Sequence, residues 1–280
     1  MLSKSKKTIK NQVHLRGIGV HSGKMVNLWI QPSGSGKIIF QRTDKSDAVL
    51  NLDVRKIQAM QSSSLVQGDI KVRTLEHLMA VLFVYGINSA VIKLDGEEIP
   101  IFDGSALTFL KAVEKSGIKA LPMNKKFIAI KKAFKIEEKG AYLSGEPNSN
   151  LKITYGIEYS HPRIGTQELS LNIDQNSFKR EIAPARTFGF LKDAEILKKK
   201  KLALGSSLHN TIVLDDKEII NPPLRFKDEF VRHKILDLLG DLSLLGGELS
   251  GHFRAEKAGH YLHLQAVRFL LKNKDFCETM

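Results

Sequence analysis

A chain of 280 residues, 42% hydrophobic and 26% charged, has the composition of a globular protein with room for two domains. No apolar run approaches the roughly 20 residues of a membrane span, and the single cysteine, Cys277, excludes a disulfide framework and a cysteine-based zinc ribbon. The formal net charge of +13 indicates an anionic partner, which leaves nucleic acid, a phosphate-bearing substrate and an anionic membrane face open.

The first half of the chain predicts strands followed by helices. Alternating apolar residues predict strands over residues 8–15 and 26–30, with a glycine-rich turn at residues 17–23 between them. A helix over residues 76–85, with Thr74 as its N-cap, precedes a strand over 89–94 and a helix over 106–116. The basic N-terminus has no apolar stretch behind it, so we expect no signal peptide and a cytoplasmic location.

The second half repeats this order of elements. Its predicted elements are strands over residues 127–130 and 151–155, a helix over 229–245, a strand over 248–255 and a helix over 260–271. The repeated order suggests an ancient duplication. We therefore predict an α+β fold of two similar domains, residues 1–123 and 124–280, each a sheet covered by helices, with the helices packed between the sheets.

Residues 190–204 do not fit this order. They place leucine, isoleucine and alanine around four consecutive lysines at residues 198–201. One interpretation is an ordinary amphipathic helix and loop. The other is an apolar passage with a basic rim, suited to a lipid chain near a membrane.

The predicted helix over residues 229–245 carries His233, Asp237 and Asp241 at intervals of four, so all three lie on one face. An imidazole and a carboxylate so placed can bind one zinc or iron ion, although a surface helix with a charged stripe is the simpler alternative. Further candidates, distant in the sequence, are Glu76, His77 and His260. Three metal ligands, together with one further carboxylate and one further imidazole that do not bind the metal, indicate a hydrolytic metal centre.

Six stretches of the chain support this interpretation: residues 19–23 (GVHSG), 74–78 (TLEHL), 99–105 (IPIFDGS), 185–190 (ARTFGF), 224–237 (LRFKDEFVRHKILD) and 257–260 (KAGH). In this order and spacing they resemble the UDP-3-O-acyl-N-acetylglucosamine deacetylases, and the resemblance extends from Thr8 to about Leu271. It implies zinc-dependent hydrolysis of the N-acetyl group of UDP-3-O-acyl-N-acetylglucosamine. The products are UDP-3-O-acyl-glucosamine and acetate, in the committed step of lipid A synthesis.

The resemblance also implies the metal site and the groups that transfer protons. One catalytic Zn²⁺, with Fe²⁺ as an alternative metal in the cell, would be held by His77, His233 and Asp237. Three protein ligands and one open position are what a catalytic zinc needs. Glu76 would be the general base and His260 the general acid.

Three more residues near the reaction centre have roles by resemblance. Thr187 would hold the developing oxyanion, and Asp241 would orient His260 and favour its charged form. Lys234 would stabilise charge near the reaction centre or the diphosphate. A solvated helix residue remains the alternative for Lys234, and a helix-face charge the alternative for Asp241.

The resemblance implies three contacts with the polar part of the substrate. Phe188 would pack on the sugar, Tyr159 would stack on uracil and Lys257 would meet the diphosphate, although a buried aromatic of the second sheet is an equal interpretation of Tyr159. An insert at about residues 190–210 corresponds to the acyl-chain passage. Its candidate contacts are Leu202 and Gly205.

Two rival functions stay open. A different zinc amidase or hydrolase is the nearer one, although the H-E-x-x-H pattern of many zinc peptidases is absent. A basic nucleic-acid-binding protein would explain the charge but not the histidines and carboxylates. We expect a UDP-linked acylated amino sugar as partner, transient contact with the inner membrane surface, no nucleic acid and no obligate protein partner.

Overall fold

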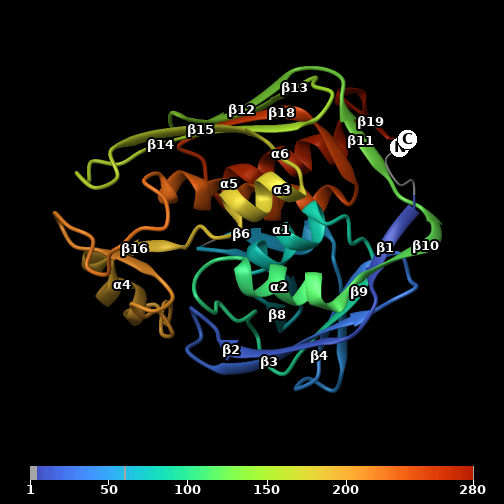
Figure 1. The fold of residues 1–280 in the computed structure, drawn as a ribbon, viewed down its shortest axis with the longest axis horizontal. Coiled ribbons are helices and arrows are strands. Elements are labelled where there is room, and N and C mark those ends of the chain that lie inside the picture. Colours follow the sequence, from blue (N-terminus) through green and yellow to red (C-terminus); the bar gives the residue numbers. More distant parts are fainter. Residues whose placement is uncertain (1–4, 60, 280) are drawn as a thin grey trace.

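The computed structural model describes residues 5–59 and 61–279 and shows an α+β fold, as the sequence predicts. Figure 1 shows two larger sheets as outer layers, with the main helices between them. These helices are α1 (Glu76–Val84), α2 (Leu107–Ser116), α5 (Glu229–Leu242) and α6 (His260–Lys272). The predicted helices are thus confirmed, with α5 three residues shorter than the pattern indicates.

The first sheet consists of β2 (Val13–Ile18), β3 (Met25–Pro32), β4 (Ile38–Arg42), β5 (Ala48–Asn51) and β9 (Ala90–Leu94). Its order is β2-β3-β9-β4-β5; β4 and β9 are parallel and the other pairs antiparallel. In β3, Val26, Leu28 and Ile30 are buried while the residues between them are partly exposed. This period of two turns one face of the sheet toward the helices.

The second sheet is built around the long strand β18 (Glu248–Glu256). This strand pairs antiparallel with β13 and parallel with β11 and β14. The remaining strands of the sheet are β11 (Phe127–Ile130), β12 (Phe134–Glu138), β13 (Ala141–Glu146), β14 (Leu151–Glu158), β15 (Thr166–Asn172) and β19 (Cys277–Thr279).

Helices α1 and α5 cross very closely at the centre of the molecule. A Cβ atom added to Gly240 would lie 2.3 Å from the backbone oxygen of Glu76, so this crossing requires glycine. Twelve of the fourteen residues of α5 are buried, and these include His233, Asp237 and Asp241. The close crossing brings the first turn of α1 beside the last two turns of α5.

Smaller elements surround these layers. They are the pair β1 (Ser5–Ile9) and β10 (Ile118–Asn124), the sheet β6 (Ile57–Ala59), β7 (Ser63–Gln67) and β8 (Ile70–Val72), and the parallel pair β16 (Phe188–Phe190) and β17 (Ile212–Leu214). The described chain also contains two short α-helices, α3 (Gln175–Ser177) and α4 (Ala194–Lys199), and short 3₁₀ and π-helical segments. In Figure 1, α4 lies at the lower left, at the edge of the molecule.

Two local predictions are wrong. The strand predicted over residues 8–15 is two strands, β1 and β2, because the backbone N–H groups of Lys10 and Asn11 donate to the end of α2 instead of continuing a strand. Thr74 is not the N-cap of α1, which is Leu75. Thr74 has a φ of 58°, and its hydroxyl donates to the buried carboxylate of Glu98 at 3.0 Å.

The strands of the first sheet lie within residues 13–94 and those of the second within residues 127–279. This arrangement is compatible with domains at residues 1–123 and 124–280, and that division stays a prediction. Within residues 5–59 and 61–279, no helix has the length and apolar character needed to cross a membrane.

Candidate metal centre

His77, His233 and Asp237 lie together in the helical layer, each with one possible ligand atom within 4.8 Å of those of the other two. His77 is in the first turn of α1, while His233 and Asp237 are one turn apart on α5. The Nε2 atoms of His233 and His77 lie 3.5 and 3.8 Å from Oδ1 of Asp237. All three side chains are buried, so their shared space is shielded from solvent.

The protonation of these residues tests whether a metal ion fits. His233 Nδ1 donates to the backbone oxygen of Ala185 at 3.1 Å, which leaves Nε2 without a proton, facing a carboxylate oxygen. Burial lowers the pKa of both imidazoles, and for His77 burial together with the neighbouring His233 lowers it to about 3. Two neutral imidazoles and a carboxylate with converging lone pairs fit a divalent cation, and this ligand set suits zinc or iron(II).

Glu76 points into the same space from the residue before His77. Its Oε2 accepts a hydrogen bond from the backbone N–H of Ser63 at 3.1 Å, and its Oε1 lies 3.8 Å from Nε2 of His260. Burial raises the pKa of Glu76 to about 8, even though the charge of His260 opposes this shift. A carboxyl group with such a pKa can exchange a proton near neutral pH.

His260 begins α6 and is bound to a carboxylate of α5. Its Nδ1 donates to Oδ2 of Asp241 at 2.7 Å, and its Nε2 lies 3.9 Å from Oδ2 of Asp237. Burial alone would lower the pKa of His260, but the charge and hydrogen bond of Asp241, with Glu76 and Asp237, raise it to about 10. This shift favours the imidazolium form of His260, whose Nε2 faces Glu76 and Asp237.

Three buried residues that the sequence analysis does not single out complete this arrangement. Ser63 Oγ donates to Oδ1 of Asp241 at 2.5 Å, and His263 Nδ1 donates to Oδ2 at 2.8 Å. Tyr155 Oη lies 3.0 Å from Nε2 of His263. Asp241, His260 and His263 could also ligate a cation, but these hydrogen bonds occupy them. The one sequence feature that could have indicated His263 is its spacing of three from His260, which puts both histidines on one face of α6.

Lys234 and Phe188 lie beside the metal cluster. Lys234 Nζ donates to Oδ2 of Asp237 at 3.0 Å and lies 5.8 Å from the centre of the Phe188 ring. Burial would lower the pKa of Lys234, but the carboxylate of Asp237 outweighs it and the pKa is raised. Thr187 is partly exposed, and its backbone N–H donates to the oxygen of Gly104 at 2.9 Å. The structure thus places a cation and an aromatic ring beside the metal cluster.

Tyr159 and Lys257 lie farther from the metal cluster. The Tyr159 ring packs edge-on against Phe188, with ring centres 5.8 Å apart, and it is partly exposed rather than fully buried. Lys257 is exposed and forms an ion pair with Glu158. A role for Lys257 toward a diphosphate would require this ion pair to open.

The insert packs on the glycine-rich turn of the first half. A Cβ atom on Gly205 would lie 2.3 Å from the backbone oxygen of Gly19, and Gly205 N–H donates to the oxygen of Val20 at 3.0 Å. Leu202 is partly exposed on this insert. Further leucine and isoleucine side chains between residues 191 and 208 are about half exposed, namely Leu191, Ile196, Leu204 and Leu208. The insert therefore presents an unusually apolar surface.

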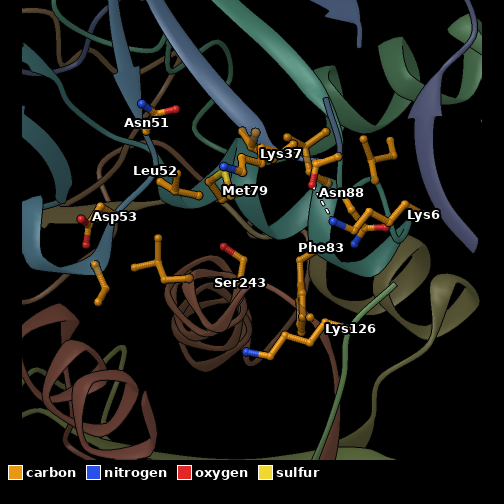
Figure 2. Close-up of a pocket in the computed structure, with 18 of the residues that line it drawn as sticks. Lys6, Lys37, Asn51, Leu52, Asp53, Met79, Phe83, Asn88, Lys126 and Ser243 are labelled. Carbon is orange, nitrogen blue, oxygen red and sulfur yellow. Dashed lines mark hydrogen bonds between the residues drawn. The ribbon is translucent and has the colours of Figure 1, made fainter. Parts of the chain in front are cut away.

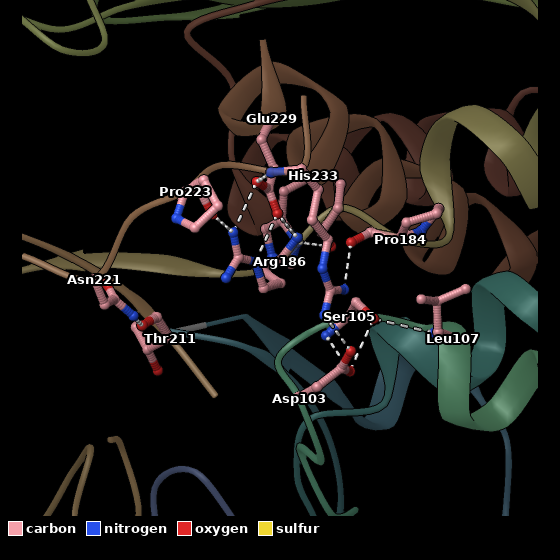
Figure 3. Close-up of polar contacts among 12 residues, drawn as sticks. Asp103, Ser105, Leu107, Pro184, Arg186, Thr211, Asn221, Pro223, Glu229 and His233 are labelled. Atoms are coloured by element: carbon pink, nitrogen blue, oxygen red, sulfur yellow. Dashed lines mark hydrogen bonds and ion pairs between the residues drawn. The ribbon is translucent and has the colours of Figure 1, made fainter. Parts of the chain in front are cut away.

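A buried ion pair fixes the chain beside the metal cluster, as Figure 3 shows. The backbone N–H and Nε of Arg186 donate to Oε1 of Glu229 at 3.0 and 2.9 Å, and the backbone N–H of Arg225 donates to Oε2 at 2.6 Å. This clamp ties residues 184–187 to the start of α5, where the oxygen of Ala185 orients His233.

Replacing Glu229 by Ala should therefore destabilise the fold. The side chain is fully buried, so its loss leaves Arg186 unpaired, and we expect the free energy of unfolding to fall by about 3–5 kcal/mol. Urea denaturation of both proteins measures this difference. The matched control is Glu218→Ala, which breaks an exposed pair with Arg163 and should cost about 1 kcal/mol or less. Equal losses of unfolding free energy in the two variants would contradict a stabilising role of the buried ion pair.

Two neutral imidazoles and a carboxylate, next to a carboxyl group of raised pKa and an imidazolium, form the kind of site that metal-dependent hydrolases use. The comparison with protein families is more specific than this class. The chain belongs to the LpxC family, described as UDP-3-O-acyl N-acetylglycosamine deacetylase, whose model matches residues 6–272.

Individual relatives cover almost the whole chain. A protein named UDP-3-O-acyl-N-acetylglucosamine deacetylase from Thermodesulfovibrio yellowstonii is 44% identical over 267 residues, which are 95% of this chain and 91% of the relative. Proteins of the same name from a Geobacter species and from Nautilia profundicola are 42% and 41% identical, over 98% and 96% of this chain and 90% and 93% of their own. The family resemblance predicted from the six sequence stretches is thus confirmed.

Proposed function

We propose that this chain is a zinc-dependent deacetylase, which hydrolyses the N-acetyl group of UDP-3-O-acyl-N-acetylglucosamine as a cytoplasmic step of lipid A synthesis. The names of the relatives support the substrate. The observation that carries the reaction is the convergence of His77, His233 and Asp237, with Glu76 and His260 beside them.

Each residue of the site has a distinct part in this reaction. Zinc held by the two histidines and the aspartate would polarise the acetamide carbonyl and lower the pKa of a water molecule. Glu76, as a carboxylate, takes a proton from the attacking water. His260 gives its Nε2 proton to the departing amine, which is otherwise a poor leaving group. Thr187 and Lys234 supply a hydroxyl and an ammonium group for the developing oxyanion.

The insert at about residues 190–210 supplies the apolar surface for the acyl chain, and it is also the part of the molecule suited to transient contact with a membrane surface. Its half-exposed leucines and isoleucine, and Leu202, support this assignment. Phe188 and Tyr159 are the proposed contacts of the sugar and the uracil, and the edge-on packing of their rings supports a shared aromatic surface. Lys257 stays the proposed contact of the diphosphate.

Replacing Leu202 by Asp should weaken binding of the acylated substrate far more than binding of an analogue without the acyl chain. Each buried methylene is worth about 0.8 kcal/mol, so the chain dominates affinity. Direct titration of both ligands measures the difference. Val49→Asp introduces the same charge at an exposed position of β5 and should leave both affinities unchanged. If Leu202→Asp weakens binding of both ligands equally, the acyl chain does not bind at this segment.

Replacing His263 by Phe should lower turnover by about tenfold or more, because Asp241 loses a hydrogen bond that holds it toward His260. The Michaelis constant should change little, since neither residue is a proposed substrate contact. His263→Asn offers a side-chain N–H in place of Nδ1 and should restore most of the turnover. Similar losses in the Phe and Asn variants would show that His263 serves packing alone.

The proposed function is tested by an assay of acetate release from UDP-3-O-acyl-N-acetylglucosamine, with simple acetylated peptides measured in parallel and the metal content determined. Release from the UDP-linked substrate alone is expected. Preference for peptides would favour another zinc amidase. Binding of nucleic acid that falls steeply with salt and persists without metal would favour the basic binding protein.

A further inference from the structure

A second cavity lies away from the metal centre, between the two halves of the chain. Its volume is about 530 Å³, and Figure 2 shows the side chains that line it. Helix α1 contributes to both sites, with Glu76 and His77 at the metal centre and Met79, Leu82 and Phe83 at this cavity. The two sites are therefore distinct.

The walls of the cavity are largely apolar. Met79 and Leu82 are buried at its base, while Leu52, Phe83 and Leu244 remain partly exposed. Partly exposed apolar side chains around one hollow are the usual lining of a small-molecule site, and volumes of about 300–1,000 Å³ are typical of such sites.

The polar groups of the cavity carry mainly positive charge. Lys6, Lys37 and Lys126 line it, and the ion pairs found among the described residues include none of the three. Lys6 Nζ donates to the backbone oxygen of Gly36 at 2.8 Å. This oxygen is neutral, so the positive charge of Lys6 is not balanced by it. The carboxylate that also lines the cavity, Asp53, is already bound by Arg55.

We propose that this cavity binds a single-chain amphiphile, with an anionic head group near Lys6 and Lys37 and an alkyl chain against Met79 and Phe83. The charge of the lysines selects an anion, and the apolar wall selects a chain of methylene groups. A fatty acid and an alkyl phosphate share this chemistry. The proposal does not depend on the function proposed for the metal centre.

The test uses a fluorescent reporter in the cavity. The chain has one tryptophan, Trp29 on β3, so the double variant Trp29→Phe and Phe83→Trp carries its only indole at the cavity wall. Adding Leu202→Asp to this variant removes binding in the acyl passage of the insert. Octanoate, decanoate and decyl phosphate are titrated separately.

We expect a saturable change in indole emission with each anion, and a dissociation constant that falls about fourfold for each added methylene. Comparing decanoate with decyl phosphate shows which head group binds tighter. Decyl maltoside, which is uncharged, should bind much more weakly. No saturable change, or equal binding of the maltoside, overturns the proposal.

The lysines supply the matched controls. Lys37→Gln should weaken decanoate binding about fivefold, and Lys37→Gln with Lys6→Gln about 25-fold, as expected when each ammonium group contributes about 1 kcal/mol. Lys139→Gln, at an exposed turn, should have no effect. Calorimetric titration of Leu202→Asp alone, with and without Lys37→Gln, gives the same comparison without the reporter substitutions. Equal affinities in that pair overturn the proposal.

Discussion

Replacing His233 by Ala should leave the protein without bound metal and lower deacetylation by about a thousandfold or more. His233 Nε2 is one of three converging ligand atoms, and its Nδ1 is already held by Ala185. Metal-ion stabilisation of developing charge is worth several kcal/mol, and each 1.36 kcal/mol is a factor of ten in rate. Elemental analysis and the acetate assay measure the two losses.

A chelator should have the same effect on the unchanged protein, and stoichiometric zinc should restore its activity. The matched control is His14→Ala, at an exposed position of β2 where the ring stacks on Trp29. This variant should keep its metal and its rate. Full activity in a metal-free preparation would exclude a metal-dependent reaction.

Replacing Glu76 by Gln should lower turnover by about a hundredfold or more and leave the metal bound. Gln has the shape of Glu but no basic carboxylate, and Glu76 accepts a hydrogen bond from Ser63 and faces His260, which agrees with its proposed role as the base. Metal analysis with single-turnover kinetics separates the two roles. Loss of zinc from this variant would identify Glu76 as a ligand.

The pH profile of the unchanged protein should be bell-shaped, because the two groups act in opposite protonation states. Activity rises as Glu76 loses its proton, with a pKa raised to about 8 by burial, and falls as His260 loses its proton, with a pKa raised to about 10 beside Asp241. A bound cation would lower both pKa values, so each limb should lie below these limits. The apparent values belong to the coupled groups. A profile that rises continuously to pH 11 would contradict the role of His260.

The sequence predicts local geometry well where one periodic element carries it. His233, Asp237 and Asp241 share a helical face because the spacing of four determines it, and α5 follows its apolar pattern closely. His77 and His260 lie on other helices, so no spacing predicts that they meet α5, and their separate roles are implied by the family resemblance. Ser63, 178 residues from Asp241, had no comparable signal.

The errors have a common physical origin in tertiary contacts. Thr74 has the residue type of an N-cap, but the buried carboxylate of Glu98 binds its hydroxyl and the backbone turns left-handed there. Residues 8–15 alternate as a strand does, yet hydrogen bonds to the end of α2 interrupt them. In both places a distant group outweighs the local preference.

The crossing of α1 and α5 at Gly240 also constrains how this family can vary. At this crossing the backbone of Glu76 meets that of Gly240, on the helix that carries His233 and Asp237. Any residue with a Cβ atom at position 240 would push the two helices apart and move Glu76 and His77 away from His233 and Asp237. An alignment of relatives should therefore show an invariant glycine at this position. The reason would be the short distance between the two helices and not a part in the reaction.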